Sequence, residues 1–158
     1  MTTYRVRDLL SHLKASDADQ AVAEAKEFIE VFESSSGRSI PPSARLGISQ
    51  HLWNDHLDSS ACTRCPHAPL LSAWESRLPT IRLWPAWQRL HERKPNKPPM
   101  WSAYKKLSIY LSLEQAGLTP GTRLSSKQQG NRFILCEGHN RVTLLAAMGH
   151  LDDEFVVE

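Results

Sequence analysis

The feature that most constrains this chain lies in residues 132–149, where a short apolar run passes through a glycine into a helical pattern. Four apolar residues, Phe133 to Cys136, lead into Glu137-Gly138, and the helix-like run NRVTLLAAM follows at once. We therefore expect a strand over 132–137, a helix over 140–148 that Gly149 ends, and a last strand over 154–157. This order predicts that the final part of the chain mixes strands and helices.

A helix that begins just after Gly138 would leave its first backbone N–H groups without partners, and its dipole adds partial positive charge there. Gly138 would let a phosphate approach the backbone, because it carries no Cβ. Arg141 would lie in the first turn, where its guanidinium can grip two phosphate oxygens. The junction is therefore a candidate phosphate site formed by Gly138, His139, Asn140 and Arg141.

Two neighbouring side chains make the junction a candidate for catalysis. His139 can move a proton near neutral pH, and Glu137 can accept a proton or hold a metal-bound water. A purely structural interpretation is also open, in which Asn140 caps the helix and Arg141 pairs with Glu137. The junction alone does not decide between them.

The rest of the chain gives helical patterns and connections. We expect helices over residues 4–14, 17–33, 43–57 and 102–116. Asp17 or Asp19 would cap the second helix, and Gly117 would end the last. The proposed division is a helical N-terminal region over 1–77 and an α/β core over 78–158.

Composition sets limits on the class of protein. The 158 residues suit one ordinary domain, and 41% of them are hydrophobic, which is enough for a core. No run approaches 18 apolar residues and the start lacks the apolar stretch of a secretory signal, so we expect a cytoplasmic protein with no membrane contact. The net charge of +2 is too small to identify a nucleic-acid binder.

A cysteine–histidine cluster occupies residues 51–67, HLWNDHLDSSACTRCPH. Cys62 and Cys65 have the Cys-x2-Cys spacing that lets two thiolates hold one zinc, and His67 and His56 are the nearest further ligands. A bound zinc would have a structural role and hold a loop in place, because four protein ligands leave no open position for catalysis. Two partly buried thiols and a redox pair remain open as alternatives.

Several landmarks fall in a familiar order along the C-terminal half. They are EQAGL at 114–118, FILCEGHNR at 133–141, AAMG at 146–149 and FVV at 155–157. Together they resemble the core of the ParB/sulfiredoxin superfamily, over about 80 residues. The resemblance implies an α+β fold, a small mixed sheet with helices, preceded here by a helical N-terminal region.

The resemblance also implies a function. Members bind nucleotide or nucleic-acid phosphate at a Gly-x-x-Arg turn, which corresponds to Gly138 and Arg141, and Glu137 takes the common acidic position. The implied partners are ATP, CTP or DNA, with Mg²⁺ or Mn²⁺ beside the nucleotide. NTPase or metal-dependent nuclease activity is therefore expected as one outcome, with Glu137 and His139 as catalytic residues.

The sequence departs from the superfamily in two places. Sulfiredoxins carry a reactive cysteine between the glycine and the arginine, where this chain has His139, and Cys136 lies on the other side of Gly138. Partition proteins follow this core with a helix-turn-helix, whereas this sequence ends at Glu158. The alternative function is a non-catalytic interaction module, related to plasmid, phage or defence systems, in which the core is a retained scaffold and the helical N-terminal region binds a protein partner.

Overall fold

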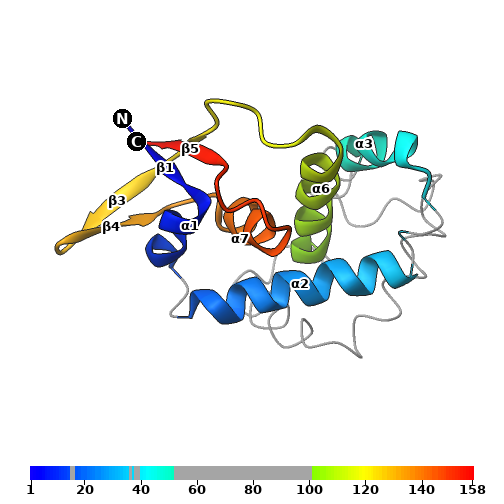
Figure 1. The fold of residues 1–158 in the computed structure, drawn as a ribbon, viewed down its shortest axis with the longest axis horizontal. Coiled ribbons are helices and arrows are strands. Elements are labelled where there is room, and N and C mark those ends of the chain that lie inside the picture. The colour runs from blue at the N-terminus through cyan, green and yellow to red at the C-terminus, as the bar shows by residue number, and fades with distance from the viewer. Residues whose placement is uncertain (15–16, 36, 38–39, 52–100) are drawn as a thin grey trace. The chain divides into compact units, whose positions relative to one another are not determined.

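The computed structural model describes residues 1–14, 17–35, 37, 40–51 and 101–158 of the chain (Figure 1). These residues form a mixed α+β structure with small sheets, which confirms the expected fold class. Among them, no helix combines the length and the apolar character that crossing a bilayer requires.

The chain divides into two compact units. One comprises Met1–Lys26 with Ala116–Glu158, and the other comprises Glu27–Gln115. The boundary expected between residues 77 and 78 falls outside the described residues, so that division stays a prediction. The N-terminal strand nevertheless groups with the C-terminal segment, because it pairs with the last strand.

The first unit contains a three-stranded sheet of order β1-β5-β2. Strand β1 (Thr2–Arg5) pairs antiparallel with β5 (Glu154–Val157), and β2 (Arg123–Leu124) pairs parallel with β5 on its other side. The sheet is therefore mixed. Every second residue of β5 is buried, as expected for a strand with one face against a core.

A separate hairpin joins β3 (Ser126–Gln129) to β4 (Arg132–Leu135), with Gln129 opposite Arg132. The two residues between the strands are Gly130 and Asn131, and Gly130 has φ 61°, as a two-residue hairpin turn requires. The far end of this hairpin extends away from α7, and three residues separate the end of β4 from the start of α7 (Figure 1).

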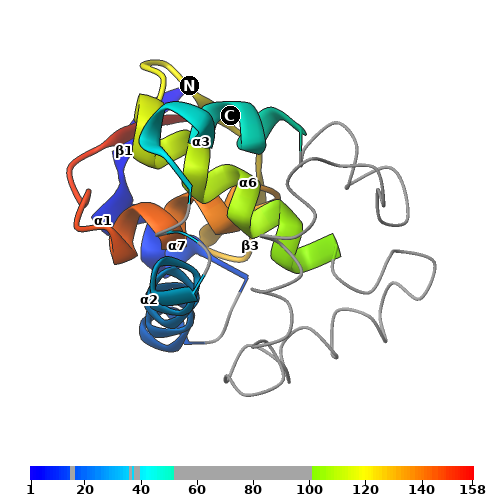
Figure 2. The same ribbon diagram turned by 90° about the vertical axis from the view of Figure 1, so that its right-hand side faces the viewer.

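Two helical segments of the first unit pack together. They are α1 (Val6–Leu9), continued by the 3₁₀ helix η1 (Leu10–His12), and α7 (His139–Ala147). Helices α1 and α7 lie side by side in both views (Figures 1 and 2). The buried core side chains here are Val6, Leu9, Leu13, Leu124, Ile134, Leu135, Val142, Leu144, Leu145, Ala146, Phe155 and Val157.

The second unit is helical in its described residues. Helix α2 (Ala18–Ser35) begins in the first unit and continues into this one, followed by α3 (Pro42–His51) and α6 (Trp101–Ala116). The buried side chains are Phe28, Phe32, Ile40, Ile48, Leu107, Ile109, Tyr110, Leu111 and Leu113. Buried Ser49 and Ser108 donate to each other's backbone carbonyls at 2.7 and 2.8 Å, which joins α3 to α6.

Most of the expected elements are confirmed, but the helix predicted over residues 4–14 is wrong at its start. Residues 2–5 form a strand instead, because Thr2, Thr3 and Tyr4 suit a pleated surface and pair with β5. That partner lies about 150 residues away in the sequence, so a local pattern does not reveal it. Helix α3 is described only as far as His51, so the rest of the helix expected over 43–57 lies outside the described residues.

Candidate functional site

The strand-to-helix junction has the predicted form. Strand β4 ends at Leu135, the Cys136 N–H donates to the Ser125 carbonyl at 2.9 Å, and α7 begins at His139. Gly138 lies between them with φ 85° and ψ 6°, in the left-handed region. Its carbonyl accepts the first helical bond, from the Val142 N–H at 3.0 Å.

Gly138 is required by the backbone and by packing. A side chain at φ 85° is strained, because Cβ approaches the following carbonyl oxygen. A Cβ at this position would also collide with Cδ2 of Leu124, a side chain that is fully buried in strand β2. The structure thus gives Gly138 a folding role whether or not a ligand binds beside it.

The start of α7 carries no side-chain cap. The backbone N–H groups of Asn140 and Arg141 have no acceptor within the part of the chain that the structure describes. The structural alternative required Asn140 to cap the helix and Arg141 to pair with Glu137, and neither contact is formed. Within the described ranges of the chain, the first turn of α7 therefore keeps two backbone donors without an acceptor.

The two charged residues of the junction differ in exposure. Arg141 is half-buried and makes no hydrogen bond or ion pair with the described residues, while Glu137 is exposed and equally unpaired there. One guanidinium and two amides, none of them paired with a described residue, thus lie within a single helical turn. That combination suits the charge-assisted binding of an anion.

His139 is held by a segment that sequence reasoning missed. Its Nε2 accepts the backbone N–H of Lys14 at 3.2 Å. A neutral ring is required for this bond, because a protonated imidazole has no lone pair at Nε2 to accept it. A proton transfer through Nε2 would first have to break the contact with Lys14.

Residues 11–14, which we call the strap, run alongside β4 and the start of α7. Arg132 Nη1 donates to the Ser11 carbonyl at 3.3 Å. The His12 ring stacks on Phe133, with centroids 3.7 Å apart and planes 2° apart, and its Nδ1–H donates to the Phe133 carbonyl at 2.9 Å. The strap therefore places the exposed Lys14 beside the junction, although Lys14 and His139 are more than 120 residues apart in the sequence.

The metal ligands predicted at Cys62, Cys65, His67 and His56 all lie outside the described residues, so the zinc site stays a prediction. Within the described residues, no group of three or more His, Cys, Asp or Glu side chains is placed to hold a metal. The junction can offer a divalent cation one ligand, the exposed carboxylate of Glu137. That fits a Mg²⁺ whose other ligands are water and substrate phosphates.

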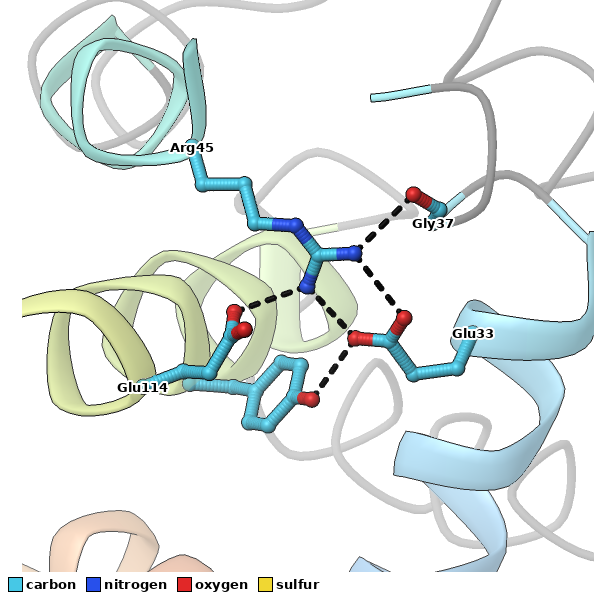
Figure 3. A network of polar contacts seen from close by, with 5 residues as sticks. Glu33, Gly37, Arg45 and Glu114 are labelled. Atoms are coloured by element: carbon cyan, nitrogen blue, oxygen red, sulfur yellow. Dashed lines mark hydrogen bonds and ion pairs between the residues drawn. The ribbon is translucent and has the colours of Figure 1, made fainter. Parts of the chain in front are cut away.

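The second unit contains a polar network that the sequence did not predict (Figure 3). The Arg45 side chain is only 8% exposed and donates to both oxygens of Glu33 at 2.6 and 2.9 Å. It also donates to Glu114 at 2.7 Å and to the Gly37 carbonyl at 2.9 Å. Tyr110 donates its hydroxyl to Glu33 at 2.7 Å. One guanidinium therefore ties together α2, α3, α6 and the residue Gly37.

Electrostatics in this network follow from those contacts. The hydrogen bond from Arg45 lowers the pKa of Glu33, and the same bond raises the pKa of Arg45. Burial and the bond to Glu33 raise the pKa of Tyr110, which keeps its hydroxyl protonated. Arg45 Nε is buried without a partner among the described residues. The network joins helices, and we assign it a structural role.

The junction is thus a helix start with a left-handed glycine and an exposed carboxylate, where two amides and one arginine have no partner in the part of the chain that the structure describes. This geometry suits an anion, and the Lys14 N–H donates to Nε2 of the neighbouring His139. Comparisons with family models, with curated proteins and with solved structures gave no match to this chain.

Proposed function

We propose that this protein binds the phosphate of a nucleotide or of a nucleic acid at the start of α7. The observation that carries the proposal is that the Arg141 side chain and the backbone amides of Asn140 and Arg141 have no partner among the described residues. A half-buried arginine without a protein partner is costly unless something anionic meets it, since a guanidinium loses hydration there.

The resemblance to the ParB/sulfiredoxin superfamily supports the same proposal. Its Gly-x-x-Arg turn corresponds to Gly138 and Arg141, and those residues occupy the left-handed cap and the first turn of α7. ATP, CTP and DNA are the partners that follow from it. A nucleotide would bring Mg²⁺ or Mn²⁺ with its phosphates, and Glu137 would supply a carboxylate to that ion.

Binding without turnover is favoured over hydrolysis. His139 Nε2 accepts the Lys14 N–H, a contact that a proton on Nε2 would have to displace. Phosphoryl transfer depends chiefly on positioned charge, which leaves a slow NTPase or nuclease reaction as the measurable alternative. In that case Glu137 would position the metal-bound water.

Titration calorimetry with ATP and CTP in the presence of Mg²⁺ tests the proposal. Arg141→Ala should abolish binding, whereas Arg7→Ala, at an exposed residue of the same unit, should leave it unchanged. Unchanged binding by Arg141→Ala would refute the assignment. Turnover above background that is lost in Glu137→Ala and in His139→Ala would instead show that the junction is catalytic.

A further inference from the structure

Strand β1 lies at the edge of the three-stranded sheet, and its outer side is unpaired within the described part of the chain. The sheet order is β1-β5-β2, so β5 pairs with one side of β1 and no described strand pairs with the other (Figure 1). Thr2, Thr3 and Arg5 are exposed, and Tyr4 is half-buried. Such an edge is a template for a further strand, because it offers a row of backbone N–H and C=O groups.

The hydrogen-bond pattern shows which backbone groups of β1 point outward. The Val6 N–H donates to the Asp153 carbonyl at 2.9 Å, and bonded pairs alternate with non-bonded pairs along an antiparallel ladder. Counted from that bonded pair, Thr3 and Arg5 fall at non-bonded positions, so their N–H and C=O groups point away from β5. Val156, opposite Thr3, accordingly donates its N–H on the β2 side of β5. Among the described residues, none bonds to the outward backbone groups of Thr3 or Arg5.

The charges along this edge are balanced. Arg5 lies 3.8 Å from carboxylate oxygens of both Asp152 and Glu154, and Arg7 lies 2.6 Å from Asp152. Two cations are thus matched by two anions. Strand β1 also lacks proline and lysine, which often protect an exposed edge. A charged peptide finds no complementary charge here, whereas a second copy of this neutral edge is not repelled.

The edge is complementary to itself. In an antiparallel pair with a two-fold axis at Thr3, that residue exchanges both backbone hydrogen bonds with Thr3 of a second copy. Arg5 then lies opposite Met1 of the second copy, and Tyr4 lies opposite its Thr2. No like charges face each other in this register. Met1, which is 82% exposed in the single chain, is covered by the aliphatic stem of Arg5.

The opposite edge of the sheet does not offer an equivalent template. Strand β2 has only two residues, Arg123 and Leu124, and Leu124 is fully buried. Pairing is therefore expected between two β1 strands. An interface of this kind uses the same surface of both copies and closes at two, so it does not grow into a filament.

We propose that two copies of this chain associate through antiparallel pairing of their β1 strands, which joins two three-stranded sheets into one continuous sheet. A strand of four residues buries a small area, so the dimer is weak and depends on concentration. The proposal goes beyond phosphate binding at the start of α7 and does not rest on it. It assigns an interaction surface to a different element of the fold.

Sedimentation velocity of the full chain over a series of concentrations tests the proposal. Wild type should shift from one copy to two as the concentration rises. Thr3 lies opposite itself in the proposed register, so Thr3→Lys and Thr3→Glu each place like charges directly opposite one another. Each variant should associate with itself about threefold more weakly than wild type. An equimolar mixture of the two should associate about tenfold more tightly than either variant alone, because the opposed charges then attract.

Thr2→Lys and Thr2→Glu are the matched controls, because Thr2 lies opposite Tyr4 of the second copy and not opposite itself. Each should associate like wild type, and mixing them should bring no gain. Wild type that stays monomeric at every concentration would overturn the proposal and leave the edge to a strand of another protein. A mixture of the Thr3 variants that associates no more tightly than its components would also overturn it, as would an equal gain on mixing the Thr2 variants.

Discussion

Replacement of Gly138 by alanine should destabilise the first unit through two separable effects. The left-handed backbone, with φ 85°, costs a residue with a Cβ about 1–2 kcal/mol. The collision of that Cβ with Leu124 adds about 1–3 kcal/mol, because Leu124 is fully buried and has little room to move. The free energy of unfolding should therefore fall by about 2–5 kcal/mol in Gly138→Ala.

A double-mutant cycle with Leu124→Val separates the two effects. Valine lacks both Cδ atoms, one of which is the atom struck, and the change alone should cost about 1 kcal/mol. In that background Gly138→Ala should cost only the backbone part, about 1–2 kcal/mol. Chemical denaturation of the four proteins gives the coupling energy. A cost for Gly138→Ala that is the same in both backgrounds would refute the packing argument.

Three further predictions concern the second unit and the cap of α2. Arg45→Met should lower the free energy of unfolding by about 3 kcal/mol in chemical denaturation, since it leaves Glu33 and Glu114 without their cation, and adding Glu33→Gln should restore part of the loss. If the loss of stability in the double variant equals the sum of the losses in Arg45→Met and Glu33→Gln, the two residues are not coupled. Because the folded state lowers the pKa of Glu33, ionised Glu33 contributes to the free energy of unfolding. This contribution is complete at a pH above the ordinary pKa of 4.5 and is lost as the pH falls through the lower pKa of the folded state. The difference in unfolding free energy between wild type and Glu33→Gln, measured from pH 7 downward, should therefore shrink below about pH 4.5. A difference that grows below that pH would contradict the lowered pKa of Glu33. Asp17→Ala should cost about 1 kcal/mol in thermal or chemical unfolding, because Asp17 Oδ1 accepts the Gln20 N–H at 3.0 Å, and a loss of the same size in Asp17→Asn would argue against capping.

Local patterns predicted much of the fold correctly. The amphipathic stripe of α2 and its Asp17 cap, the stop of α6 at Gly117, and the order of β4, α7 and β5 all follow from interactions within a few residues. The helix expected over residues 4–14 included the end of β1, because the pairing partner of that strand, β5, is at the other end of the chain. Residues 1–26 group with 116–158 for the same reason, since no local signal marks such a contact.

The candidate site was predicted in part. Gly138, Asn140 and Arg141 lie where the strand-to-helix pattern placed them, because backbone geometry decides their positions. The strap could not be predicted, since the contacts of Ser11, His12 and Lys14 depend on how distant segments pack.

The Arg45 network was missed for a related reason. A single arginine on α3 and two glutamates on other helices form no sequence motif, and only helix packing brings them within hydrogen-bonding distance. A buried arginine could have been suspected from its place near the buried Ile48 on α3, but its partners could not.

Phosphate binding at the start of α7 is tested most directly by NMR. Backbone amide resonances of ¹⁵N-labelled protein would be followed while ATP or CTP is added with Mg²⁺. If phosphate binds at the start of α7, the amides of Asn140 and Arg141 should shift most, together with that of Lys14, whose N–H donates to His139. Saturating nucleotide that leaves these amides unmoved, or that shifts a different part of the protein, would contradict it.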